Sequence, residues 1–208
     1  MAKAKSAATA KRKVAKATKK VAKADLAVTH KAARLRDTPV MRVVAALADA
    51  ADQPPLILAS LGTLAIGLVA RRGDLARGGA RMLASHLLAT AAKSVIKHQF
   101  DRTRPSAALD GDGHHFRKGD EGDHDEKSFP SGHTAGAVAV ARAAAHEIDG
   151  AAVPSALAVG AVAAAQAPAG NHYLSDVMAG AVIGWASEAV VSAVFDRLEP
   201  KVEEALSS

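Results

Sequence analysis

Long alanine-rich runs without charged side chains are the feature that most restricts how this chain of 208 residues can fold. Residues 54–70 and residues 150–175 contain no Asp, Glu, Lys or Arg. Runs of this length exceed an ordinary β-strand, and alanine has the strongest helix propensity of all residues. No segment shows the alternation of β-branched or aromatic residues with polar ones that marks a half-buried strand. The sequence therefore predicts an all-α fold, arranged as a multi-helix bundle.

The apolar segments predict five to six helices in this bundle. We expect them at residues 39–51, 54–70, 82–98, 130–145, 151–167 and 177–195. The first of these is short, amphipathic and charged, which suits an interface better than a membrane span. An arginine-rich connection is predicted at residues 71–81.

The spacing of small residues favours helices that pack together in lipid. Gly132 and Gly136 are four residues apart, as are Gly180 and Gly184, and this pattern lets two helices approach closely. Residues 54–70 are at the short limit for crossing a bilayer. We therefore expect a polytopic protein, multi-pass in the bacterial inner membrane. An alanine-rich soluble bundle is the alternative.

Residues 1–36 are predicted to form a Lys/Ala-rich basic tail ahead of a helical domain at residues 37–200. The tail contains twelve Lys or Arg residues and one acidic residue, Asp25. Such a polycation is attracted to anionic lipid and to nucleic acid. Nucleic acid is the weaker prediction, because the tail has no aromatic residue to stack on bases. We expect a solvated, partly helical extension or a segment that contacts anionic lipid.

Residues 101–128 are predicted to form a long polar loop, since acidic residues and glycines replace the apolar pattern there. The loop contains three histidines among carboxylates, His114, His115 and His124. Their spacing matches no fixed pattern of metal ligands. We therefore favour solvated side chains over a metal site.

Three clusters of polar residues lie at the ends of predicted helices, where they can meet around one anion. They are Lys97 followed after six residues by Arg104-Pro105, then Ser128-Phe129-Pro130-Ser131-Gly132-His133-Thr134, then His172-Tyr173-Leu174-Ser175-Asp176. Any one of them alone is most often an ordinary solvated helix end. Their joint occurrence predicts an anion site at one edge of the bundle.

The first two clusters have the chemistry of a phosphate cradle. Lys97 and Arg104 can neutralise a phosphoryl group, the arginine through its planar fork and the lysine as a point charge. A helix that begins at residues 130–133 adds free backbone N–H groups and the positive end of its dipole. Gly132 permits close approach of the backbone, and Ser131 offers a hydroxyl donor.

The third cluster has the chemistry of a nucleophile. His172 and Asp176 are four residues apart, so they share one face if the segment is helical. A carboxylate beside an imidazole fixes its tautomer and stabilises the cation that forms on it. This arrangement suits a nucleophilic histidine.

In their order and spacing, the three clusters resemble the signature of the type 2 phosphatidic acid phosphatase superfamily, which also includes bacterial acid phosphatases and vanadium haloperoxidases. The resemblance covers residues 82–187. It implies that His172 attacks phosphorus to form a phosphohistidine, that Asp176 orients it, and that His133 protonates the leaving oxygen. It also implies phosphate binding by Lys97, Arg104, Ser131 and Gly132. This scheme requires no metal or other cofactor, and the expected substrate is a lipid phosphate such as phosphatidate or a polyprenyl diphosphate.

One position departs from the family's pattern, because Ala165-Gln166 stand where the third cluster normally opens with Ser-Arg. Gln166 can donate a hydrogen bond but has no charge. The lost contact would cost on the order of a few kcal/mol of transition-state stabilisation unless Arg102 compensates. This departure favours one alternative to a phosphatase, a noncatalytic relative that binds phospholipid headgroups. The composition of residues 1–36 favours another, an interaction module tethered by its polycationic tail. A vanadium-dependent peroxidase fits so short and apolar a chain less well.

Overall fold

The chain is helical apart from two short strands in a computed structural model that describes residues 2–35, 38–49, 51–111, 113–119 and 123–207. The helices are α1 (Ala2–Ala33), α2 (Pro39–Asp49), α3 (Gln53–Val69), α4 (Gly73–Lys97), α5 (Pro105–Asp110), α6 (Gly132–Glu147), α7 (Ala152–Gln166) and α8 (Leu174–Ser207). Between α4 and α6 lie the strands β1 (Phe100–Arg102) and β2 (Phe116–Lys118) and the 3₁₀ turn η1 (His124–Glu126). The all-α prediction is confirmed, with eight α-helices in the described residues where five to six were expected.

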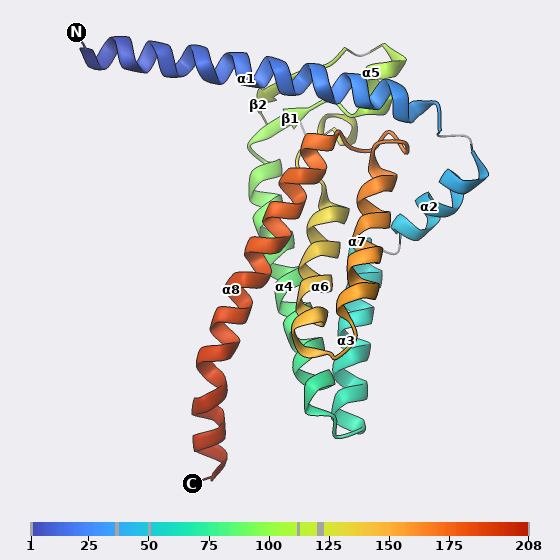
Figure 1. Cartoon of the computed structure of the whole chain (residues 1–208), viewed down its shortest axis with the longest axis vertical. Helices are drawn as coiled ribbons and strands as arrows, with labels where there is room; N and C mark the ends of the chain where they lie inside the picture. Colours follow the sequence, from blue (N-terminus) through green and yellow to red (C-terminus); the bar gives the residue numbers. More distant parts are fainter. Residues whose placement is uncertain (1, 36–37, 50, 112, 120–122, 208) are drawn as a thin grey trace.

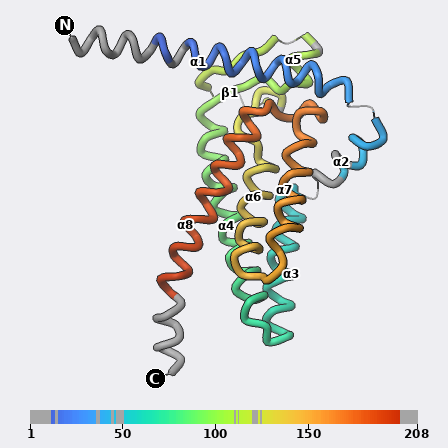
Figure 2. Tube along the Cα trace, in the orientation of Figure 1, coloured from blue at the N-terminus to red at the C-terminus, as the bar shows by residue number. Residues whose placement is uncertain are grey.

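The bundle consists of α3, α4, α6, α7 and α8, which contact one another side by side, and α1 crosses one end of it (Figure 1). Helix α4 contacts α3, α6 and α8, and α6 also contacts α7 and α8, so α4 and α6 form the centre. Small side chains allow this arrangement, since Ala89 on α4 and Ala135, Ala139 and Ala143 on α6 are fully buried. The tube in Figure 2 shows the end of α4 and the starts of α6 and α8 lying towards the end that α1 crosses.

Glycines bring α8 close to α6. A Cβ atom at Gly180 would overlap the carbonyl oxygen of Ser131, and one at Gly184 would overlap the carbonyl oxygen of Ala135. Any larger residue would therefore push the two helices apart. The predicted close packing through this glycine pair is confirmed.

The predicted connection at residues 71–81 is wrong, because α4 begins at Gly73 and includes most of it. Asp74 in the first turn complements the positive end of the helix dipole. Gly79 then faces α3, where a Cβ atom would overlap the backbone of Leu64. Gly79, one of the glycines that suggested a loop, is therefore a contact position between two helices.

The predicted loop at residues 101–128 contains regular structure. Strand β1 pairs antiparallel with β2, and Phe100 lies opposite Lys118. The rings of Phe100, Phe116 and Phe129 contact one another, with centroids 5.3 to 6.3 Å apart. This aromatic cluster supports a strand pair within a polar segment, so the expectation of no strands is wrong here.

The basic tail forms one helix, α1, and its C-terminal half packs on the bundle. One face of this half buries Asp25, Thr29 and Ala32. The lysines of the described side chains lie on other faces and are exposed: Lys13, Lys16, Lys19, Lys20, Lys23 and Lys31. The tail is therefore partly a structural element at one end of the bundle.

The outer surface of the bundle is apolar. Within the described residues, Leu174–Leu198 of α8 is the one helical segment long and apolar enough to cross a membrane, and α3 and α7 are apolar but shorter. Large apolar side chains on these three helices are exposed: Leu58, Ile66, Leu68, Val153, Leu157, Met178, Val182 and Trp185. A protein surrounded by water rarely exposes so many.

Candidate active site

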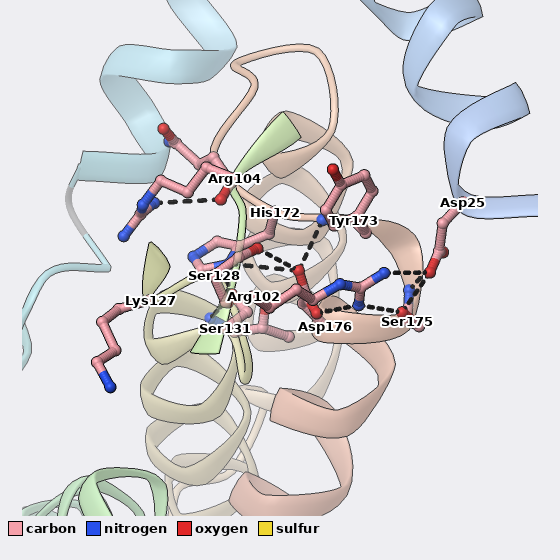
Figure 3. A network of polar contacts seen from close by, with 12 residues as sticks. Asp25, Arg102, Arg104, Lys127, Ser128, Ser131, His172, Tyr173, Ser175 and Asp176 are labelled. Atoms are coloured by element: carbon pink, nitrogen blue, oxygen red, sulfur yellow. Dashed lines mark hydrogen bonds and ion pairs between the residues drawn. The ribbon is translucent and has the colours of Figure 1, made fainter. Parts of the chain in front are cut away.

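The three polar clusters meet at the end of the bundle that α1 crosses (Figure 3). Lys97 ends α4, Arg104 precedes α5, and His172 lies in the loop between α7 and α8. A cavity of about 100 Å³ opens beside them. It is lined by Ala51, Asp52, Gln53, Lys93, Lys97, Arg104, Gly132, His133 and His172. The structure therefore brings five of the predicted site residues to one cavity.

The loop backbone positions His172. Gly170 has a positive φ of 74°, and the turn places the N–H groups of Asn171 and His172 on the carbonyl of Gln166. Only 2% of His172 is exposed, and its Nδ1 lies 2.7 Å from the carbonyl oxygen of Ser128. A carbonyl oxygen only accepts hydrogen bonds, so Nδ1 has the proton and Nε2 keeps a free lone pair.

The surroundings of His172 favour the neutral imidazole. Burial lowers the pKa of His172 well below its usual 6.5, and the positive charges of Arg104 and Lys97 lower it further. A neutral imidazole with a free Nε2 has the protonation state that a nucleophile needs.

Asp176 holds His172 through an intermediate residue. Its Oδ2 lies 4.0 Å from Nδ1 of His172, which is too far for a hydrogen bond. The same oxygen accepts from the hydroxyl of Ser128 at 2.5 Å and from the N–H of Tyr173 at 2.9 Å. The predicted direct pair is therefore replaced by a relay, in which Asp176 fixes Ser128 and the carbonyl of Ser128 fixes the imidazole.

Two lysines and one arginine bring positive charge to the cavity. Lys97 donates to the carbonyl of Lys127 at 3.1 Å, and Arg104 donates to the carbonyl of Asn171 at 3.1 Å. Lys93 lies about one helical turn before Lys97 and lines the same cavity. The carbonyl partners position the two cations without neutralising their charge.

The first turn of α6 contributes Gly132 and His133 to the cavity lining. A Cβ atom at Gly132 would lie 2.7 Å from Nζ of Lys93, so the glycine leaves room for that amino group. Ser131 instead caps the helix, since its buried hydroxyl accepts from the N–H of Thr134 at 3.4 Å. The residue does not line the cavity, and its contact with phosphate stays a prediction.

His133 contacts a carboxylate that the sequence did not single out. Its Nε2 lies 2.8 Å from Oδ1 of Asp52, the residue just before α3. An ionised carboxylate only accepts hydrogen bonds, so this contact places a proton on Nε2. The ring centres of His133 and His172 are 6.4 Å apart, which leaves space for a small group between a proton donor and a nucleophile.

Gln166 and Arg102, the two further phosphate ligands that the sequence suggested, do not line the cavity. Gln166 is buried and donates to the carbonyl of Val162 at 3.1 Å. Arg102 points to Asp25 and Asp176, as Figure 3 shows. These side chains are held in other contacts, and their role as phosphate ligands stays a prediction.

Three residues near the site were missed by the sequence analysis. Lys93 was detectable, because its spacing of four from Lys97 places both on one helix face. Asp52 and Asp25 gave no local signal, since their partners lie far away in the sequence.

The loop histidines have other contacts. His115 pairs with Glu126, and the ring of His114 packs edge-on against Tyr173 with centroids 5.1 Å apart. The side chain of His124 lies outside the described residues. Across the side chains that the structure describes, no group of three His, Asp or Glu residues is arranged to hold a metal ion.

These features define a helical-bundle protein with a cavity that combines a buried, neutral histidine with clustered cations. The sequence profile of the PAP2 superfamily matches residues 78–200, more than half of the chain. The chain therefore belongs to the PAP2 superfamily, and the resemblance found in its motifs is confirmed.

Two solved structures share this fold. LpxE from Aquifex aeolicus matches with a TM-score of 0.62 at 20% identity, covering 81% of this chain and 94% of LpxE. The transmembrane PAP2-type phosphatidylglycerolphosphate phosphatase from Bacillus subtilis matches with a TM-score of 0.59 at 19% identity, covering 86% of this chain and 87% of that one. No curated protein matches the sequence.

Proposed function

We propose that this protein is a metal-independent phosphatase that hydrolyses a phosphomonoester or diphosphate on a lipid through a phosphohistidine at His172. The observation that carries the proposal is the buried imidazole of His172, with its Nδ1 bonded to the carbonyl of Ser128 and its Nε2 left free beside a cationic cavity. Membership of the PAP2 superfamily supports the reaction type. The shared fold with a phosphatidylglycerolphosphate phosphatase supports a lipid phosphate as substrate.

In the first step, the lone pair on Nε2 of His172 attacks phosphorus, and the bond from phosphorus to the lipid oxygen breaks. His133 gives a ring proton to that departing oxygen, and the carboxylate of Asp52, which binds Nε2, stabilises the imidazolium beforehand. Asp176 stabilises the positive charge that develops on the attacking ring, acting through Ser128. The products of this step are the free lipid alcohol or monophosphate and a phosphohistidine.

In the second step, His133 takes a proton from water, and the resulting hydroxide oxygen attacks phosphorus. The bond between phosphorus and Nε2 of His172 breaks, which returns the imidazole to its neutral state and releases inorganic phosphate. His133 thus gives a proton to the leaving group in the first step and takes one from the attacking water in the second, as microscopic reversibility requires.

The negative charge of the transferred group is stabilised by Lys93, Lys97 and Arg104, together with the backbone at Gly132. All four line the cavity. Lys93 supplies the third positive charge that Gln166 lacks, and it reaches the cavity from α4 instead of α7. Charge-assisted contacts of this kind strengthen as the phosphoryl group moves through its transition state.

A lipid substrate requires a site close to a membrane. The exposed apolar side chains of α3, α7 and α8 suit contact with acyl chains, and the bundle would cross the bacterial inner membrane in several passes. Helix α1 would then lie along the surface at the active end. Its exposed lysines, among them Lys16, Lys20 and Lys23, suit contact with anionic lipid.

The test is phosphate release by detergent-purified protein from phosphatidate and from undecaprenyl diphosphate in excess chelator. We expect release that survives chelation and falls by at least about 10⁴-fold in His172→Ala, since loss of a nucleophile removes the covalent route. Alkaline quenching during turnover should trap phosphate on His172, detectable by mass spectrometry.

A headgroup-binding protein without activity is the second candidate, because Gln166 brings no charge to the cavity. It predicts saturable binding of phosphatidate with neither phosphate release nor a trapped phosphohistidine. Inhibition of phosphate release by inorganic phosphate in the wild type would count against it.

A further inference from the structure

Asp25 is the one acidic residue among residues 1–36, and it is buried. Only 3% of it is exposed, whereas the lysines around it on α1 point to solvent. Burying an isolated carboxylate is unfavourable unless hydrogen bonds and an opposite charge compensate it. The contacts of Asp25 therefore show what α1 is attached to.

Asp25 is bound by residues of the active end (Figure 3). Its Oδ2 accepts from Arg102 at 2.7 Å and from the hydroxyl of Ser175 at 2.5 Å. Its Oδ1 accepts from the N–H of Ser175 at 3.1 Å. Three donors thus compensate the charge, and two of them come from the first turn of α8, where Asp176 is the next residue.

Arg102 links Asp25 to the residues that hold the nucleophile. One of its terminal nitrogens contacts Asp25, and the other contacts Oδ1 of Asp176 at 2.5 Å. The second oxygen of Asp176 binds the hydroxyl of Ser128, and the carbonyl of Ser128 binds Nδ1 of His172. An unbroken series of buried contacts therefore runs from α1 to the imidazole.

The sharing of Arg102 between two carboxylates determines how Asp176 is used. With Asp25 in place, Asp176 offers one oxygen to Arg102 and keeps the other for Ser128. Without a charge at position 25, the guanidinium can turn fully to Asp176 and engage both of its oxygens, since a two-pronged contact is its preferred geometry. The Ser128 hydroxyl would then lose its acceptor, and the carbonyl that orients His172 would be free to move.

We propose that Asp25 is a positioning residue of the active site. Helix α1 then contributes a residue to that site in addition to forming a basic tail. The inference rests on the proposed phosphatase function. Asp25 acts by dividing the guanidinium of Arg102 between two carboxylates, which keeps Nε2 of His172 in line for attack.

The experiment compares Asp25→Asn, which keeps size but removes charge, with Asp25→Glu, which keeps charge. We expect Asp25→Asn to lower kcat by about 10-fold to 100-fold, as small misplacements of a reacting group do. KM and the inhibition constant of inorganic phosphate should change by less than about twofold, because the cavity cations remain in place. Asp25→Glu should lie closer to the wild type.

Two control variants separate charge from helix docking. Thr29 is buried on the same face of α1, and its hydroxyl has no hydrogen-bond partner among the described residues, so Thr29→Val alters the docked face without touching the charges. Val28→Gln changes an exposed side chain of the same helix instead. Both should keep wild-type kcat in detergent. A loss in Thr29→Val equal to that in Asp25→Asn would overturn the proposal.

A second readout needs no lipid. Phosphoramidate can transfer its phosphoryl group to Nε2 of His172 with release of ammonia, and the phosphohistidine is measured by mass spectrometry after alkaline quenching. Asp25→Asn should be phosphorylated about tenfold more slowly than the wild type. Equal rates would overturn the positioning role, even if lipid hydrolysis occurs. Slower phosphorylation with no lipid hydrolysis by the wild type would support Asp25 while rejecting the proposed substrate. A wild type that is not phosphorylated on His172 would overturn both proposals.

Discussion

Two buried arginines at opposite ends of the bundle have nearly the same surroundings. Arg81 lies between Glu147 and Asp196, with its guanidinium 5.2 Å from the ring centre of Phe195. Arg102 lies between Asp25 and Asp176, and its guanidinium is 4.1 Å from the ring centre of Tyr173. Each has two carboxylates and an aromatic ring, and Arg102 has a second ring, that of Phe116, with its centre 5.5 Å away.

The two arginines differ in what their carboxylate partners contact next. The carboxylates of Arg81 connect α4 to α6 and α8, so that cluster joins helices. The contacts of Arg102 continue through Ser128 to a neutral histidine that lines a cavity with three cations. A buried arginine between carboxylates is therefore no sign of an active site. A buried, neutral histidine that shares a cavity with clustered cations is a better one.

The largest effect in this comparison is expected at Arg104, a cation of the cavity. Arg104→Ala removes a charge-assisted contact that strengthens in the transition state. We expect a loss of about 10²-fold to 10³-fold in kcat/KM. Arg104→Lys should recover only part of it, because a lysine lacks the planar fork. Arg117 on β2, with 47% of its side chain exposed, provides the control, since Arg117→Ala should leave phosphate release unchanged.

A smaller effect is expected at Lys93, which no motif contains. Lys93→Gln should lower kcat/KM by about tenfold, since a half-buried lysine gives a less directional contact than Arg104. Lys93→Arg should restore most of the loss by returning the charge. The same phosphate-release assay tests this prediction. Equal rates in Lys93→Gln and in the exposed-site control Lys118→Gln would show that Lys93 does not contribute to the site.

The sequence predicted what depends on local pattern. Helix propensity and apolar periodicity were sufficient for the bundle, and the order of the motifs was sufficient to bring His172, His133 and Lys97 to one cavity. Glycines misled the analysis at residues 71–81, because Gly79 serves contact with α3 and not a turn. A glycine has the same appearance in a sequence whether it bends the chain or admits a neighbouring helix.

The missed site residues depend on contacts between distant segments. Asp25 is 150 residues from Ser175, which donates to it. Asp52 pairs with His133 across three intervening α-helices. Ser131 was assigned to phosphate from its motif, yet its hydroxyl caps α6. Such roles follow from the assembled structure, since a hydroxyl or carboxylate has several equally good partners in an unfolded chain.

The pH dependence of the reaction tests the end of the bundle that contains the cavity, and the expected effect is smaller. Burial lowers the pKa of His172, and Arg104 and Lys97 lower it further, so the imidazole is neutral at pH 6.5, the usual pKa of a histidine. Lys97→Gln removes one positive neighbour and should raise the pKa of His172. The acid limb of kcat/KM against pH should therefore move to higher pH, by a fraction of a unit, whatever the loss in rate. A limb that stays in place would show that Lys97 does not act on His172 electrostatically.

The smallest effect on catalysis is expected at Arg81, although it is the more deeply buried of the two arginines. Arg81→Met leaves Glu147 with a weaker set of partners in a buried position, and breaking a buried ion pair on one side costs about 3–5 kcal/mol of unfolding free energy. We expect a clear fall in Tm in detergent with kcat within about twofold of the wild type, because no contact leads from Glu147 or Asp196 to the cavity in the described structure. Arg102→Met should show the opposite balance. Expressed as free energies, its loss in kcat should exceed its loss in stability. If Arg81→Met lowered kcat as Arg104→Ala does, the two ends would be coupled through α4, and the distinction between a structural cluster and an active one would fail for this bundle.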